Sequence, residues 1–366
     1  MASGAIKNRH IKIRSSRDRF AASAPAGSPR AVRLNSGVSL HWGSMEIYLP
    51  NSAHLQNIEG FIRKYDPRYP NRMRVSGHNK YIHLHPFALA MAACAGEAAH
   101  SQGVKATGTV PNVASMPYLI RMGLFKHLHL PPPLSIEEHE ESGRFVPLTQ
   151  IKTSQDLTNT ITNLIPLLHA APTVSDPIRY VISELGRNVL EHSNSPVGGF
   201  VCAQYFKDKR RIAIGIADAG IGIYNAMRTY HNPANERHAF QLALTPGISG
   251  ATPRIGGNET NAGAGLFFIR SIAKTSGNYF FIYSGNTSYK LVRRQKSRNI
   301  LYADALMEAH SMNSDLPHWQ GTAIGIDINV DETREFSGLL NLIRQSYSIG
   351  VKNEQKKKYY KAVKFT

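Results

Sequence analysis

Residues 184–192 read Glu-Leu-Gly-Arg-Asn-Val-Leu-Glu-His and close a segment with helical periodicity. Asp176 can cap this helix and Pro177 suits its first position, where no N–H is needed, so we expect a helix over residues 177–192. Apolar residues recur at helical spacing and form a buried stripe: Ile178, Val181, Ile182, Leu185 and Val189. One edge of the stripe can line a cleft and carries Glu184, Asn188, Glu191 and His192.

The polar edge of this helix has two interpretations. Its amide and carboxylate oxygens are the ligands that a hard cation such as Mg²⁺ takes, and a carboxylate one turn away can orient an attacking water. An ordinary amphipathic helix with a solvated edge explains the same pattern. The helix alone does not separate the two.

A second block follows the apolar run at residues 211–217, which is typical of a central strand buried on both faces. Asp218 ends this run, and a carboxylate there is costly to bury unless a donor such as a purine amine meets it. Gly220 and Gly222 let the backbone approach a flat ring. Taken alone, the pattern is more typical of a plain turn after a strand.

A third block places Gly263 and Gly265 directly before a helical pattern at residues 266–273. A glycine-rich turn that opens a helix exposes N–H groups and the positive end of the helix dipole, which suits a phosphate. Neither Gly-x-x-x-x-Gly-Lys-Ser/Thr nor Gly-x-Gly-x-x-Gly occurs, so the P-loop and the Rossmann fold lack their motifs.

In order and spacing, the three blocks resemble the GHKL ATPase superfamily of gyrase, heat-shock chaperone, histidine kinase and mismatch-repair ATPase. Gly321-Thr322 resembles the Gly-Thr pair that this family places beside its adenine pocket. The resemblance covers roughly residues 151–350. It implies ATP and Mg²⁺ as cofactors, with Asn188 as the Mg²⁺ ligand, Asp218 as the acceptor from the adenine amine and Glu184 as the catalytic base. The remaining binding residues that it implies are Gly220, Gly222, Gly263, Ala264, Gly265, Leu266 and Thr322.

The resemblance also implies a mobile lid over the ATP, formed by the long stretch from about residue 230 to 260. Arg254 and Lys274 could reach phosphates or could be solvated surface charges. The Glu184-x-x-x-Asn188 spacing followed by His192-Ser193 is most similar to the anti-sigma factor serine kinases. The sequence has no convincing helix with a phosphoacceptor histidine, which argues against a self-phosphorylating histidine kinase. It also leaves no room for the transducer domain of a gyrase or mismatch-repair protein. We therefore expect an ATPase or a serine/threonine protein kinase.

Residues 44–130 form a separate unit in which strands alternate with helices. We expect strands at 45–49, 80–84 and 104–110, and helices at 87–100 and 116–125. The region from Pro86 to Phe125 weakly resembles STAS domains, the partners of anti-sigma kinases. Their phosphoacceptor serine would fall near residues 83–86, where this chain has none, so a sensor or docking module is implied.

The expected fold is therefore α/β with two domains. A small STAS-like α/β domain (44–130) is followed by a linker (131–150) and a GHKL (Bergerat) α/β sandwich (151–350), with a mixed sheet covered by helices on one face. With 366 residues, 42% of them hydrophobic, the chain is long enough for two independent cores.

Most of the net charge of +18 lies in two basic tails. Residues 1–43 carry eight Lys and Arg against one acid, and residues 351–366 carry six against one. The first tail is expected to be disordered. The tails could attract nucleic acid weakly, or an acidic partner, or they could simply be solvated.

Cysteine and histidine placement favours no disulfide and no metal. Cys94 and Cys202 are expected to be buried thiols, and with no signal peptide or apolar span they indicate the cytoplasm. His83 with His85 and His127 with His129 lie two apart, as strand-borne metal ligands would, but satisfied or exposed histidines are favoured.

These observations predict an ATP- and Mg²⁺-binding regulatory protein in signal transduction. Its GHKL domain would act as a nucleotide-dependent switch, with slow ATP hydrolysis or phosphoryl transfer to a protein partner. The alternative is a non-catalytic nucleotide-binding adaptor that binds protein or nucleic acid through its N-terminal domain and basic tails.

Overall fold

The computed structural model describes residues 12–13, 45–66, 72–136, 145–164, 171–256, 263–292, 300–333 and 336–362. Most of the expected N-terminal tail, the acidic stretch 137–141 of the expected linker, and Asn261 before the glycine turn lie outside these residues. Within the described ranges, no helix has both the length and the apolar composition that a membrane crossing requires.

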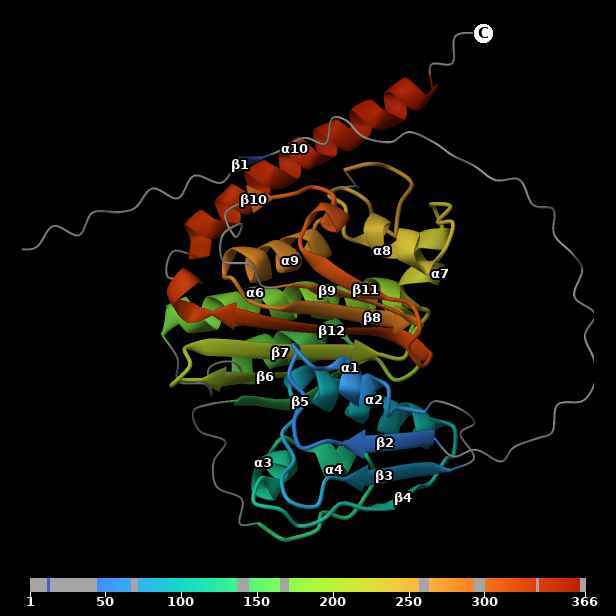
Figure 1. Cartoon of the computed structure of the whole chain (residues 1–366), viewed down its shortest axis with the longest axis vertical. Helices are drawn as coiled ribbons and strands as arrows, with labels where there is room; N and C mark the ends of the chain where they lie inside the picture. Colours follow the sequence, from blue (N-terminus) through green and yellow to red (C-terminus); the bar gives the residue numbers. More distant parts are fainter. Residues whose placement is uncertain are drawn as a thin grey trace, which may run out of the picture.

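A seven-stranded sheet forms the centre of the molecule (Figure 1). Its strands are β5 (Phe145–Ile151), β6 (Gly199–Phe206), β7 (Arg211–Asp218), β8 (Phe280–Gly285), β9 (Thr287–Leu291), β11 (His310–Asn313) and β12 (Trp319–Asn329). They lie in the order β11-β9-β8-β12-β7-β6-β5, and each of these pairings is antiparallel. The expectation of a mixed sheet was therefore wrong.

The central pair, β7 and β12, has a different character on each face. Successive side chains of a strand point to opposite faces, so every second residue shares a face. One face carries six isoleucines from these two strands: Ile212, Ile214, Ile216, Ile324, Ile326 and Ile328. Asp218 and Thr322 follow them at one end of that face. The other face carries small residues and one carboxylate, among them Ala213, Gly215, Gly325 and Asp327.

Helices pack on the isoleucine face and share one core with it (Figure 1). They are α5 (Ser154–Asn159), α6 (Pro172–Asn188), α7 (Gly222–Arg228), α8 (Glu236–Ala243), α9 (Gly265–Thr275) and α10 (Phe336–Ala362). The α6 helix begins at Pro172 rather than at the expected Pro177, which lies inside it. A π-helical turn (Val189–Ser193) continues α6 and ends at Asn194, whose φ is 49°.

The N-terminal unit covers the opposite face of the sheet. Its three strands, β2 (Met45–Leu49), β3 (Met73–Gly77) and β4 (Ala106–Thr109), form a parallel sheet in that order. Its helices are α1 (Glu59–Ile62), α2 (Pro86–Ser101), α3 (Met116–Arg121) and α4 (Leu124–His127). The expectation that helices cover only one face of the large sheet was therefore wrong.

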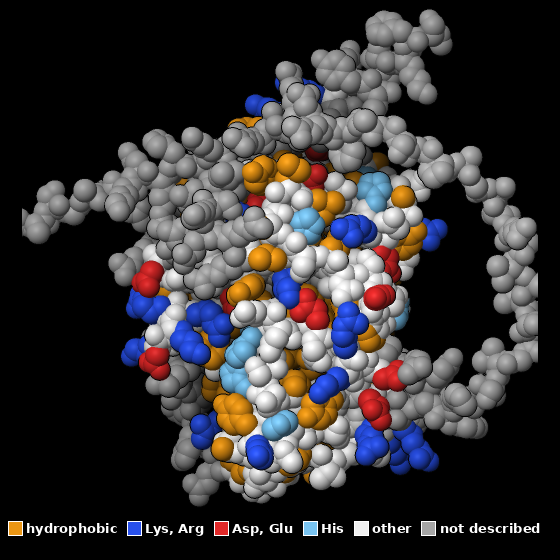
Figure 2. Space-filling view, in the orientation of Figure 1, with side chains coloured by type: hydrophobic (Ala, Val, Ile, Leu, Met, Phe, Trp, Pro, Cys, Tyr) orange, Lys and Arg blue, Asp and Glu red, His pale blue; other side chains and the backbone are white. Residues whose placement is uncertain are grey.

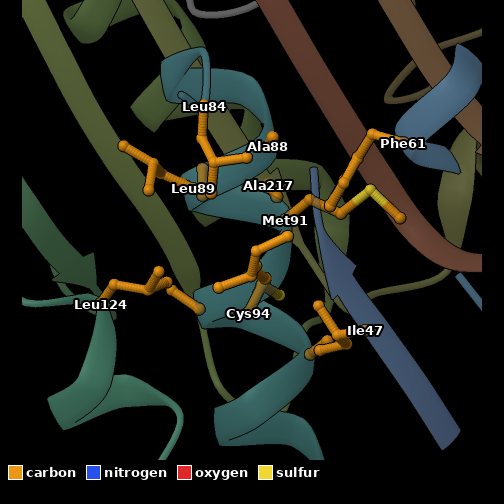
Figure 3. Close-up of a cluster of buried hydrophobic side chains, with 14 of the residues drawn as sticks. Ile47, Phe61, Leu84, Ala88, Leu89, Met91, Cys94, Leu124 and Ala217 are labelled. Atoms are coloured by element: carbon orange, nitrogen blue, oxygen red, sulfur yellow. The ribbon is translucent and has the colours of Figure 1, made fainter. Parts of the chain in front are cut away.

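The α2 helix lies between the two sheets and is buried on nearly all sides, as its alanine-rich sequence permits. Figure 3 shows its side chains meeting those of β2, α1 and the large sheet, among them Met91, Ile47, Phe61 and Ala217. The first turn approaches the sheet most closely, and a Cβ on Gly215 would overlap the backbone of Pro86 and Phe87. The N-terminal unit therefore shares its core with one face of the large sheet, whereas the isoleucine face and its helices form a second core.

Four predicted bounds of elements or regions differ from the structure. Residues 80–84 form no strand, and only Leu84 pairs, in a bridge with Ala53, while β3 lies at Met73–Gly77. The expected helix at 116–125 is interrupted at Gly123, whose φ is 75°. Phe145–Ile151, placed in the linker, is an edge strand of the large sheet, and the expected boundary at 350–351 falls inside α10.

Two short strands complete the fold. Lys12–Ile13 (β1) pairs in parallel with Ile300–Leu301 (β10). Lys12–Ile13 therefore contacts a strand in the last third of the chain.

The shared core makes a testable prediction. Gly215→Ala should lower the free energy of unfolding by about 1–3 kcal/mol, because the new methyl group displaces α2 from the sheet. Urea unfolding followed by circular dichroism measures this. Gly60→Ala is the control, because no atom lies within 4 Å of its Cβ position. Equal stability of the two variants would contradict the packing of α2 on the sheet.

Candidate functional site

Asp218 ends β7 and is buried, with 5% of its surface exposed. Its register partner on β12 is Thr322. The carboxylate oxygen Oδ1 accepts hydrogen bonds from the N–H groups of Gly220 (2.9 Å) and Thr322 (3.3 Å). Burial raises the pKa of Asp218 to about 7, although these two hydrogen bonds favour the charged form. The fold thus keeps a carboxylate where its charge is costly.

The turn after Asp218 requires both glycines. A Cβ on Gly220 would overlap the carbonyl group of Ser193, and a Cβ on Gly222 would lie 2.8 Å from the Ser284 hydroxyl, at a φ of 74°. The Ser284 hydroxyl donates to the Gly321 carbonyl (2.6 Å) and accepts from the Ile223 N–H (3.0 Å). Ser284 therefore fixes the turn against β8 and β12, and no motif around Ser284 predicts this role.

An inner cavity of about 100 Å³ lies directly in front of Asp218. Apolar side chains from several elements enclose it, and polar groups enter it at a few points. The lining residues include Asn188, His192, Asp218, Gly222, Met227, Leu266, Thr322 and Ile324.

An outer cavity of about 320 Å³ adjoins the inner one, and Asn188, His192 and Leu266 line both. Its wall is formed by the polar edge of α6, by the start of α9 and by Arg344 of α10. The lining residues include Glu184, Arg187, Glu191, Gly250, Gly263, Ala264, Gly265 and Arg344. Arg187 and Arg344 are both exposed cations that sequence reasoning did not assign to the site.

The start of α9 lies against the polar edge of α6. A Cβ on Gly265 would lie 3.2 Å from Glu184 Oε2 and 3.5 Å from Asn188 Nδ2. Glycine at this position leaves open space between the helix start and those two side chains. The outer cavity therefore faces the N–H groups that begin an eleven-residue helix.

Glu184 has a raised pKa, mainly because it is partly buried and also because the Glu191 carboxylate is near. Arg187, with Nη1 3.4 Å from Glu184 Oε1, opposes this shift. A carboxylate with a raised pKa in a cavity is a candidate general base.

The donor set also bears on the expected Mg²⁺. Among the described residues, no group of three His, Cys, Asp or Glu side chains is placed to hold a metal ion. The Asn188 amide and nearby carboxylates supply only part of an octahedral shell. This suits Mg²⁺, which commonly takes its other ligands from phosphates and water.

The predicted site residues lie together, either lining one of the two cavities or, for Gly220, hydrogen-bonded to Asp218. They are Glu184, Asn188, Asp218, Gly220, Gly222, Gly263, Ala264, Gly265, Leu266 and Thr322. Two other candidates lie elsewhere. Lys274 is buried in an ion pair with Glu308 (2.7 Å), and Arg254 is exposed and lines neither cavity. The segment 230–256 is not a simple loop, because α8 lies within it.

Three of the four paired histidines, His85, His127 and His129, have hydrogen-bond partners. His85 Nδ1 accepts from the Phe87 N–H, so its Nε2 carries the proton and donates to Asp327 (3.2 Å). His127 and His129 both contact the Glu97 carboxylate, at 2.9 and 3.1 Å.

Comparison with protein-family models finds no match, and comparisons with curated proteins and with solved structures find none either.

The raised pKa of Asp218 predicts a pH-dependent stability. The folded protein holds this proton at pH values where the unfolded chain has lost it, so the carboxyl lowers stability as pH rises from 3.8 to about 7. Asp218→Asn keeps the oxygen acceptor without the charge. It should therefore be more stable than the wild type at pH 8, by about 2–4 kcal/mol, and nearly equal to it at pH 4.

Urea unfolding of both proteins at the two pH values measures this difference. If the difference in unfolding free energy between Asp218→Asn and the wild type were the same at both pH values, the pKa of Asp218 would not be raised by folding.

Proposed function

We propose that this chain is an ATP- and Mg²⁺-binding regulatory protein in which the region 151–350 acts as a nucleotide-dependent switch of the GHKL type. One observation carries the proposal. Two adjoining cavities have a buried carboxylate, Asp218, in the wall of the inner one and the glycine-rich start of α9 in the wall of the outer one. A purine nucleotide has matching groups, an exocyclic amine at one end and phosphates at the other.

The inner cavity suits adenine. Its apolar walls match a flat ring, and Asp218 offers an acceptor to the amine. Burial of this carboxylate without a cationic partner is costly, and the amine would provide the missing donor. A role in binding would account for a buried carboxyl that lowers stability at this position.

The outer cavity suits a triphosphate. Backbone N–H groups at the start of α9 and the helix dipole favour anions, and Arg187 and Arg344 add positive charge. Mg²⁺, held by Asn188 and the phosphates, would neutralise charge on the phosphoryl groups. In this proposal Glu184, whose pKa is raised, would accept a proton from an attacking water or hydroxyl.

The switch would act through α10, which contacts three parts of this site. Arg344 lines the outer cavity, and Tyr347 packs on Phe267 and Phe268 of α9, with ring centroids 6.0 and 5.8 Å apart. Further along, Gln355 Nε2 donates to the carbonyl of Ile255 in the expected lid (3.3 Å). A nucleotide that orders the lid would therefore shift α10, and the partner would respond to that helix.

The N-terminal unit fits this proposal as a fixed sensor or docking module. We propose that this unit is STAS-like. Its α2 helix packs on the large sheet in a shared core. A signal sensed there would reach the nucleotide site through β7 and β12.

Replacing Asp218 tests nucleotide recognition. Asp218→Asn should weaken ATP affinity by on the order of 1.5–3 kcal/mol, because an amide replaces the charged acceptor. Calorimetric titration measures this, with Asp304→Asn as the control, because Asp304 caps a short helix outside both cavities. An unchanged affinity would remove Asp218 from the binding site, and reduced folding could not explain a loss in a variant that is expected to be more stable.

Replacing Glu184 separates the switch with turnover from the non-catalytic adaptor. Glu184→Gln should retain ATP binding but reduce hydrolysis or transfer by roughly 10²–10⁴-fold, because the amide cannot accept the proton. Phosphate release and phosphoryl transfer to co-purifying proteins are the two readouts. If the wild type binds ATP and shows neither activity, the adaptor becomes the better account.

A further inference from the structure

A second cluster of chemistry-bearing side chains lies on the face of the sheet opposite the cavities. The hairpin between β6 and β7 meets residues 53–54 and 81–85 of the N-terminal unit there. We call this cluster the ring patch, and its members are His54, Tyr81, His83, Phe206, Lys209 and Arg211. Figure 2 shows histidines, basic side chains and hydrophobic side chains adjoining on the visible surface.

The rings of the patch form a continuous series. His54 and His83 have ring centroids 4.5 Å apart, and Tyr81 stacks on His83 at 6.4 Å with planes 15° apart. The Phe206 ring centroid also lies 6.4 Å from that of His83, with the two planes 34° apart, and the Arg211 guanidinium lies 4.6 Å from the centroid of the Phe206 ring. Tyr81 is 45% exposed, so the series ends in an aromatic side chain that solvent or a ligand can reach.

The charge around the rings is positive. Lys207, Lys209 and Arg210 are exposed on the hairpin, and Asp208 is the acid among them. Arg210 is paired with Asp331 (2.6 Å), and Asp327 is already shared by Arg211 and His85. Lys209, which is close enough to His83 to affect its pKa, thus provides a cation beside the rings, and Lys207 is a second exposed cation on the same hairpin.

The polar groups of the patch are not fully satisfied by the fold. Three buried nitrogens here lack a hydrogen-bond partner: His54 Nδ1, His83 Nδ1 and Arg211 Nε. Burial, together with neighbouring histidines, Arg211 and Lys209, lowers the pKa of His83 to about 4, so its ring is neutral at pH 7. Buried polar atoms without partners are uncommon and call for an explanation. Here they mark a cluster that packing alone does not account for.

We propose that the ring patch binds single-stranded nucleic acid. An unstacked base would lie on Tyr81 at the end of the ring series, and the adjacent phosphates would contact the basic hairpin. Aromatic faces interleaved with cations are the general means of holding a single strand without sequence preference. A duplex offers no free base face to Tyr81, and an acidic peptide or inorganic anion offers charge without a ring. This site is independent of the nucleotide site and of the basic chain ends.

Fluorescence anisotropy with the full-length protein and labelled oligothymidylate tests this, at two salt concentrations. Tyr81→Ala should weaken single-strand affinity by roughly tenfold, whereas Tyr81→Phe, which keeps the ring, should bind nearly as the wild type does. Lys209→Ala should also weaken binding and reduce its salt dependence, because one phosphate contact is lost. Lys126→Ala is the matched control, since this exposed lysine lies in α4, beside the other end of α2.

Inorganic polyphosphate and a duplex of equal length serve as competitors. Polyphosphate binding should be insensitive to Tyr81→Ala, and the duplex should compete weakly. The proposal is overturned if the wild type does not bind the single strand. It is also overturned if Tyr81→Ala and Lys209→Ala leave the affinity unchanged, or if polyphosphate affinity falls as much as oligonucleotide affinity in Tyr81→Ala. Equal unfolding temperatures of the variants exclude a folding defect.

Discussion

The pairing of β7 with β12 is the constraint on which the rest of the structure depends. It runs in register from Asp218 opposite Thr322 to Arg211 opposite Asn329. Isoleucines on one face bind the helices that build the cavities, and small residues on the other admit α2. The same two strands hold the buried carboxylate at one end and the base of the ring patch at the other, about 24 Å away at the usual strand rise. Any shift in this register would disrupt both.

Local sequence patterns predicted the elements around the cavities well, but not how the layers pack. Gly265–Thr275 and Arg211–Asp218 form the helix and strand that glycine placement and apolar runs indicate. The position of α2 could not be predicted, because an alanine-rich helix buried on all sides has no face that identifies its neighbour. The start of α6 was predicted too late in the chain. Asp176 and Pro177 are typical of a helix start, but Pro172 occupies the first position of the helix and Pro177 lies inside it.

Candidate site residues could be predicted where they belong to a short motif. Residues that reach the site from distant segments of the chain could not. Asp218 and Gly265 lie in short motifs. A carboxylate directly after a buried strand, and glycines directly before a helix, are each unfavourable without a particular role, and this can be recognised from the sequence alone. Ser284, which fixes the turn, and Arg344, which lines the outer cavity, come from distant segments with no motif of their own. Lys274 was misjudged because its partner, Glu308, is far along the chain and buries it. Long-range packing decided each of these cases.

The central claim is that the inner cavity recognises adenine through Asp218. The most direct test is a calorimetric titration of the wild-type protein with ATP and with GTP, each with Mg²⁺. Adenine presents an amine donor where guanine presents a carbonyl acceptor, so an ionised carboxylate should attract the first and repel the second. The account predicts saturable binding of ATP at one site, with GTP weaker by at least about tenfold. Equal affinities, or no binding of ATP, would contradict it.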